Sequence, residues 1–227
     1  MLVGRYRKGG AAKINLTGSA GGKKQAFTFH STFAETSNGE TNGFVARLWA
    51  TRRIGDIIDD LDLHGRNQEL VDELVALSQK HGILTPYTSF LADENVSLSS
   101  RKDNAAFAAR SAAEQLSVVG GSAGFMQREE KAKFQNATNA PAAPGAQSQT
   151  LRQVGRKAFF KKGRLWQDST VTAEQAKTAI HVVQFSPRYF DLAASHGGIM
   201  ARYLAFKEPV LVNLGAQTYQ IDSEPAR

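Results

Sequence analysis

The chain has 227 residues, of which 41% are hydrophobic and 22% charged, and this composition is typical of a globular protein that can bury one or two cores. It contains no cysteine, which excludes disulfide bonds and thiol chemistry within it, and no apolar run approaches the roughly 20 residues of a transmembrane helix. The formal net charge of +7 favours an acidic partner, such as a nucleic acid, an anionic lipid or an acidic glycan.

Residues 1–36 alternate between polar and apolar side chains, as β-strands do. Two alternating stretches, 12–17 and 25–33, flank a glycine-rich turn at 18–22. The pattern predicts a β-hairpin or a piece of a β-sandwich. The sequence GGKK at 21–24 lacks the spacing of a phosphate-binding loop and a helix after it, so it predicts no nucleotide site.

The stretch 44–94 carries the longest run of structural signal in the chain. Apolar residues recur at helical spacing over 44–61 and again over 70–77, with charged residues on the opposite face. Asn67 is a good N-cap for the second helix, and Gly82 suits the left-handed position that follows a helix. The pattern predicts a helical hairpin.

Residues 83–91 alternate around a proline, which predicts a bulged or edge strand after the hairpin. Asp103 and Asn104 are candidates to cap an alanine-rich helix that runs to about Val118. Because the apolar face of this helix is weak, we expect it to pack on a partner or a neighbouring domain. Residues 37–119 would together form the central unit.

Residues 120–150 are rich in Ala, Gly, Pro, Asn and Gln, and their low apolar content predicts a flexible linker. Within them, GGSAG at 120–124 matches the G-x-S-x-G pattern of serine hydrolases, with Ser122 as the nucleophile. Downstream acids and bases that a triad would need are Asp168, Asp191, His181 and His196. The residues before Ser122 look helical instead of forming a buried strand, so a serine hydrolase is a disfavoured second alternative.

Basic and aromatic residues crowd the stretch 152–166. The six basic residues are Arg152, Arg156, Lys157, Lys161, Lys162 and Arg164. The pattern predicts a hairpin that turns at Lys162 and Gly163 and has a solvated cationic face. A polyanion or nucleic-acid surface is the alternative, although no RNP, zinc-finger or helix-turn-helix pattern supports nucleic acid as the partner.

Local signals divide the remainder of the C-terminal unit. Thr172 and Gln175 match a capping box that opens a short helix, and Ser186 followed by Pro187 starts a longer one. Apolar runs predict strands over 179–185 and 218–221, and either strands or buried helices over 200–206 and 209–214.

The patterns together predict an α+β fold, in which sandwich-like β-strands at both ends flank a helical hairpin, with a flexible Ala/Pro/Gly linker. The predicted units are 1–36, 37–119, 120–150 and 151–227. The five histidines lie far apart and show no metal-ligand spacing. We therefore predict no metal, no cofactor and no catalytic residue.

The tryptophan-containing helix and the GILTPYTSFL sequence that follows resemble the region after the von Willebrand factor A domain in the inter-alpha-trypsin inhibitor heavy chains and their bacterial relatives. The matching residues lie at 3–6, 16–18, 44–54 and 69–94, with a weaker match at 154–166. Those proteins carry a VIT domain, then the A domain, then a region like this one. The Asp-x-Ser-x-Ser metal motif of their A domain does not occur here, so no metal site carries over.

The resemblance implies that the chain is the C-terminal part of a longer, non-enzymatic protein of the cell envelope, the periplasm included, or of the extracellular space. It would act as a scaffold or a subunit of a larger assembly. Its protein partners would include an A domain encoded upstream.

Overall fold

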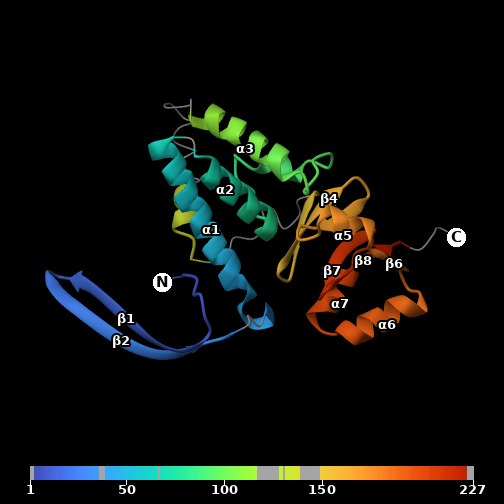
Figure 1. The fold of residues 1–227 in the computed structure, drawn as a ribbon, viewed down its shortest axis with the longest axis horizontal. Coiled ribbons are helices and arrows are strands. Elements are labelled where there is room, and N and C mark those ends of the chain that lie inside the picture. Colours follow the sequence, from blue (N-terminus) through green and yellow to red (C-terminus); the bar gives the residue numbers. More distant parts are fainter. Residues whose placement is uncertain are drawn as a thin grey trace.

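The computed structural model describes residues 3–35, 39–65, 67–116, 128–129, 131–138 and 149–223. The fold is a mixed α+β arrangement with strands at both ends of the chain flanking helices, as the sequence predicts. Figure 1 shows a long β-ribbon that projects from the body, a group of helices, and a sheet with its own short helices.

The ribbon consists of β1 (Gly10–Ala20) and β2 (Lys23–Phe33), which pair antiparallel along their whole length. The two residues between them, Gly21 and Gly22, both have positive φ, and this is the backbone that a two-residue hairpin turn requires. The hairpin prediction is confirmed. Among the described residues the two strands form a sheet of their own, and the ribbon reaches away from the helices (Figure 1).

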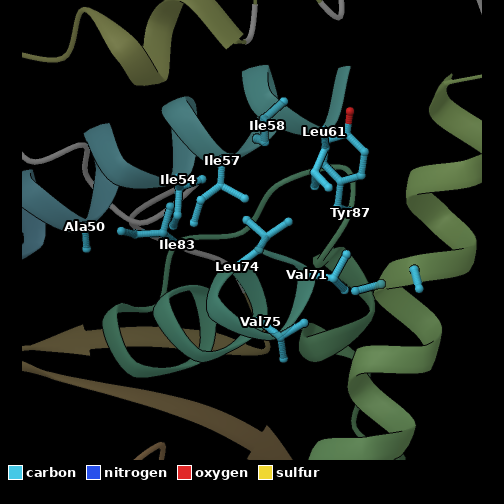
Figure 2. Packing of buried hydrophobic residues seen from close by; sticks show 12 residues of the cluster. Ala50, Ile54, Ile57, Ile58, Leu61, Val71, Leu74, Val75, Ile83 and Tyr87 are labelled. Atoms are coloured by element: carbon cyan, nitrogen blue, oxygen red, sulfur yellow. The ribbon is translucent and has the colours of Figure 1, made fainter. Parts of the chain in front are cut away.

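Three helices form the first core. The helices α1 (Gly39–His64) and α2 (Gln68–His81) make the predicted hairpin, and α3 (Arg101–Leu116) packs on α2. Ile54 and Ile57 of α1 meet Leu74 of α2 in a fully buried cluster (Figure 2). The alanine-rich helix adds Ala108 and Ala109 to the same cluster, so its narrow apolar face packs within this chain.

The ends of α2 follow the predicted caps. The Asn67 side chain accepts hydrogen bonds from the backbone N–H groups of Glu69 and Leu70, at 2.9 and 3.3 Å. Gly82 follows the helix at φ 59°, in the left-handed region. α3 begins at Arg101, before both predicted caps, so Asp103 and Asn104 lie inside its first turn. Asn104 donates from its side-chain amide to the Ser97 carbonyl at 3.0 Å.

The predicted strand at 83–91 is wrong. The chain instead makes a turn and then the single 3₁₀ turn η1 (Ser89–Ala92). A buried hydroxyl network replaces the hydrogen bonds of a sheet: Thr88 Oγ1 accepts from the Thr85 N–H at 3.1 Å and donates to Ser78 Oγ at 3.2 Å. The alternation in the sequence records the burial of Ile83, Thr85 and Tyr87, and no strand pairing.

The predicted linker is described only in part. Residues 131–135 are helical, and Phe134 packs against the core of α1 and α2. Lys131 forms ion pairs with Asp59 at 2.7 Å and with Asp62 at 3.2 Å, so this part of the segment is fixed to α1. The greater part of 120–150 lies outside the described residues.

The C-terminal unit is a six-stranded sheet in the order β3-β4-β5-β7-β8-β6. The strands are β3 (Leu151–Val154), β4 (Lys157–Lys162), β5 (Leu165–Asp168), β6 (Ile180–Val183), β7 (Val210–Leu214) and β8 (Gln217–Asp222). The pairs β5–β7 and β6–β8 are parallel, and the other neighbours are antiparallel.

Short helices connect the strands of this sheet. They are α5 (Ala173–Lys177), α6 (Pro187–His196) and α7 (Ile199–Leu204). The capping box of Thr172 and the N-cap of Ser186 both form as predicted. Of the two undecided runs, 200–206 is mostly helix, as α7, and 209–214 is mostly strand, as β7.

The basic stretch forms three strands, and the prediction of a single hairpin is corrected. Turns occur at Gly155, with φ 55°, as well as at the predicted Gly163, with φ 58°. The first turn has little signature in the sequence, because Gly155 stands alone between Val154 and Arg156, which are not typical turn residues. The stretch is therefore a meander of β3, β4 and β5.

The strand β4 joins the sheet to both neighbouring layers. Its Ala158 and Phe160 point to one side and pack with Leu91 of η1. Its Phe159 points to the other side and packs with Phe206, which follows α7. The first three strands thus lie between the helical core and the short helices of the C-terminal unit (Figure 1).

We predict that Gly82→Ala lowers the free energy of unfolding by about 3 kcal/mol. The left-handed backbone at this position disfavours a residue with a Cβ, and the added methyl group would overpack the contact with β4. A Cβ at this position would lie 2.8 Å from the Ala158 Cβ, where α2 meets β4. The matched control is Gly215→Ala, at φ 63° with open space around it, which should cost only about 1 kcal/mol. Denaturant unfolding measures both, and equal losses would contradict the proposed close contact.

Candidate interaction surfaces

The structure does not gather the six predicted basic residues on one surface. Strand alternation places Arg152, Lys157 and Lys161 on the face toward α6 and α7, whereas Lys162 points to the helical core. Arg156 and Arg164 lie in the two exposed turns of the meander. The cations that are close in sequence are therefore divided between opposite sides of the sheet.

Glu208 neutralises two of these cations. Its carboxylate lies 3.1 Å from Lys161 Nζ and 3.7 Å from Arg152, and it also accepts a hydrogen bond from the Trp166 indole. The indole hydrogen bond, followed by Lys161, holds the pKa of Glu208 below its usual value. The Arg152 guanidinium also stacks over the Trp166 ring, 4.2 Å from its centroid. On this side of the sheet, the polar groups of Lys161, Arg152 and Trp166 are therefore all in contact with Glu208.

Asp168 receives a third cation. Its fully buried carboxylate accepts hydrogen bonds from Lys157 Nζ, from the Thr170 N–H at 2.9 Å, from the Thr170 hydroxyl at 2.8 Å and from the Asn213 N–H at 3.2 Å. Four donors from three segments satisfy this carboxylate. In this geometry it joins β4, β5 and β7, although the sequence nominated it as a triad acid.

Lys162 is bound to backbone. Its Nζ donates to the Leu91 carbonyl at 3.1 Å and to the Asp93 carbonyl at 2.6 Å. Burial lowers the pKa of Lys162 to about 8. Four of the six cations thus contact carboxylates, backbone carbonyls or rings of this chain. Arg152 stays about half exposed, and Arg156 and Arg164 are exposed in the two turns.

The candidate hydrolase residues are not brought together. Ser122 lies outside the described residues. His181 Nδ1 contacts Asp222 at 2.9 Å, and His196 Nδ1 lies 3.0 Å from its neighbour Ser195. Both histidines are therefore engaged locally, and Asp191 is exposed on α6. Within the described part of the chain, no group of three or more His, Cys, Asp or Glu residues could hold a metal ion.

A groove of about 1070 Å³ lies between α2, the start of α3 and residues 169–174. Its wall includes apolar Val75 and Leu98 together with Lys80, Arg101 and Glu174. Charges of both signs line it and no set of polar groups converges on one point. The groove therefore indicates no particular ligand chemistry.

The ribbon presents the most distinctive surface. In its register Ile14 lies opposite Phe29 and Leu16 opposite Phe27, so these four apolar side chains share one face. Leu16 and Phe27 are each 49% exposed and Phe29 is 52% exposed. The opposite face is polar and includes Lys13, Asn15, Thr17, Lys24, Thr28 and His30. We call the first of these two surfaces the apolar ribbon face.

The base of the ribbon is attached to the body. The Tyr6 ring stacks on Phe33 with centroids 4.6 Å apart, and its hydroxyl donates to the Ala34 carbonyl at 2.7 Å. The Arg5 guanidinium lies 5.1 Å from the Trp49 ring of α1. The sequence identified the alternation of this segment but could not show that its apolar face stays uncovered.

A second exposed aromatic group lies at the start of α6. Phe185 and Phe190 are 58% and 56% exposed, and Phe185 has φ 65°, a conformation that a non-glycine residue rarely adopts. Tyr189 lies between them, with ring centroids 5.7 and 5.5 Å away. This aromatic group is small. The strand before it, β6, has only four residues and offers a short edge for pairing with a partner.

The described helices include none that is both long and apolar enough to cross a membrane. No protein-family model, curated protein or solved structure matches this chain.

We predict that Asp168→Asn lowers the free energy of unfolding by about 3 kcal/mol, because it leaves Lys157 without its counter-charge in a largely buried site. The control is Asp222→Asn, which breaks the exposed pair with His181 and should cost less than about 0.5 kcal/mol. Chemical denaturation of the two variants measures the difference. Similar small losses would show that the Asp168 network contributes little to stability.

A second prediction concerns His81, where α1 meets the end of α2. Burial, and then the nearby charges of Lys80 and Arg47, lower the pKa of His81 to about 4. The unfolded chain binds a proton near its ordinary pKa of about 6.5, so stability should be lost as pH falls from about 6.5 to about 4, by on the order of 2 kcal/mol. The His81→Gln variant should lack this component. If the free energy of unfolding of the unaltered chain and of the His81→Gln variant changes with the same slope over this pH range, the predicted contribution of His81 is contradicted.

Proposed function

We propose that this chain is a non-enzymatic structural and interaction module, a scaffold or subunit of a larger assembly. The apolar ribbon face carries the proposal. A two-stranded ribbon is marginally stable by itself in water, and three or more strands or a covering layer are what normally stabilise one. Burying a fully exposed large apolar side chain gains about 1.5–3 kcal/mol, and Leu16, Phe27 and Phe29 on this face are about half exposed, so full burial of each would gain roughly half of that. A partner that covers Leu16, Phe27 and Phe29 would supply that gain.

The body of the molecule suits a supporting role. Two cores share the strand β4. The ion pair of Lys131 with Asp59 attaches residues 131–135 to α1, and that of Lys157 with Asp168 joins β4 to β5. The cations of 152–166 that contact internal groups stabilise the fold and are correspondingly less available to a polyanion. Polyanion binding through that stretch is therefore the weaker candidate.

The resemblance to the region after the A domain in the inter-alpha-trypsin inhibitor heavy chains and their bacterial relatives supports the same proposal. Under it, the module is the C-terminal part of a VIT/von Willebrand factor A-like protein of the cell envelope, the periplasm included, or of the extracellular space. Its protein partners include an A domain encoded upstream. The projecting ribbon is the part of the module that would reach such a partner.

Hydrogen exchange tests the proposal. In the isolated chain, amides of the ribbon should exchange quickly, because the ribbon has only its own ladder to protect it. In the assembly purified from the natural source, the amides of 12–17 and 26–31 should exchange at least about tenfold more slowly. Those of β4 serve as the internal control and should not change.

Equal exchange of the ribbon in both samples would contradict the proposal, as would a natural form that has the mass of a single chain and no bound protein. A matched pair of variants separates binding from folding. Phe29→Ser should abolish the protection, whereas Phe190→Ser, at an equally exposed aromatic outside the ribbon, should leave it intact.

A further inference from the structure

We infer that the apolar ribbon face is covered by β-strands of an acidic protein partner, and that this partner also pairs with an edge of the ribbon. This inference rests on the proposed function and adds the chemistry of the partner to it. Geometry, charge and area each contribute one step.

The geometry favours a sheet as the covering element. Ile14, Leu16, Phe27 and Phe29 project from one side at the two-residue period of a strand, and the surface complementary to such a face is a second sheet about 10 Å away. Within the described part of the chain, β1 and β2 pair only with each other. Each therefore presents an outer edge of eleven residues with backbone donors and acceptors. A covering helix would leave these edges unpaired, whereas strands can satisfy both features.

The charge of the segment favours an acidic partner. Residues 3–35 include six lysines and arginines and a single carboxylate. The basic residues are Arg5, Arg7, Lys8, Lys13, Lys23 and Lys24, and the acidic residue is Glu35. About one seventh of the chain therefore carries most of its net charge of +7. Such a surface associates fastest and most specifically with a surface of opposite charge.

A second copy of this chain is a poor occupant. A strand of eleven residues is about 36 Å long, and two strands about 5 Å apart present a face of roughly 350 Å². A stable interface buries about 800 Å² on each partner, so any occupant, a second copy included, must also pair with a ribbon edge to bury enough surface. The two ribbons would also bring like charges together at their tips and bases.

An anionic membrane is also a poor occupant. Proteins that lie on such membranes carry cations where the side chains can reach the headgroups while the apolar face enters the bilayer. Lys13, Lys24 and His30 project from the face opposite to Phe27 and Phe29. With the phenylalanines in the bilayer, these three side chains would point into the water.

Site-specific photo-cross-linking in the natural host tests the inference. A benzoylphenylalanine replaces Phe29 on the apolar ribbon face of the full chain, or Thr28 on the opposite face as the matched control. We expect position 29 to cross-link to a peptide with strand-like alternation in a polypeptide of net negative charge, and position 28 to give about one tenth as much product or less.

Charge reversal on the ribbon supplies the second readout. With the captured partner purified, the double variant Lys8→Glu and Lys23→Glu should weaken binding at low salt by about tenfold or more, and high salt should reduce the difference. Lys23 shares the face of Phe27 by register, and Lys8 is exposed at the base of the ribbon. The double variant Lys102→Glu and Arg110→Glu, on the exposed surface of α3, should bind as the unaltered chain does.

The other outcomes are distinct. A cross-link from position 29 to a neutral or basic protein, or to a helix, overturns the inference about the partner and leaves the interaction module standing. A cross-link to a second copy, or ribbon-dependent binding to vesicles of phosphatidylcholine and phosphatidylserine, overturns the inference in favour of that occupant. No product above the level of position 28 overturns both the inference and the proposed function.

Discussion

The structure depends on the alternation of one short strand. Because successive side chains of β4 point to opposite faces, Phe159 enters the core of the C-terminal unit while Ala158 and Phe160 enter the core beside η1. A slip of one residue in its pairing would exchange the two sets and remove both from their cores. Gly82 at the end of α2 allows the helical layer to approach this strand closely, so α2 and β4 pack directly against each other.

Local signals in the sequence predicted local structure well. Asn67, Gly82, Thr172 and Ser186 each cap the helix that their residue type indicated, because a cap depends on atoms within a few residues. The strand prediction for 83–91 failed because its alternation arises from burial against α1 and α2. The Thr88 hydroxyl accepts from the Thr85 N–H and also bonds to the Thr85 hydroxyl. Such a network has no signature at the level of single residues.

The surfaces were harder to predict than the elements. The charge of 152–166 is plain in the sequence, but Glu208 and the carbonyls of Leu91 and Asp93, which receive two of its lysines, are more than forty residues away. Conversely, Phe27 and Phe29 of β2 belong to a segment predicted as a hairpin or a piece of a β-sandwich, and both lie exposed. Whether a cation or an aromatic ring is available to a partner depends on packing between distant segments, which composition does not record.

The parallel pairing of β5 with β7 also bears on how this protein is made. Trp166 of β5 lies beside Val210, and the intervening residues contribute β6, α6 and α7 before the chain returns. During synthesis the meander of β3, β4 and β5 leaves the ribosome with one edge and the aromatic side of β4 open to water, and these stay open until β7 has been translated. A pause in translation within that interval would prolong the lifetime of an aggregation-prone intermediate. We therefore expect the chain to need chaperones most while these residues are being translated.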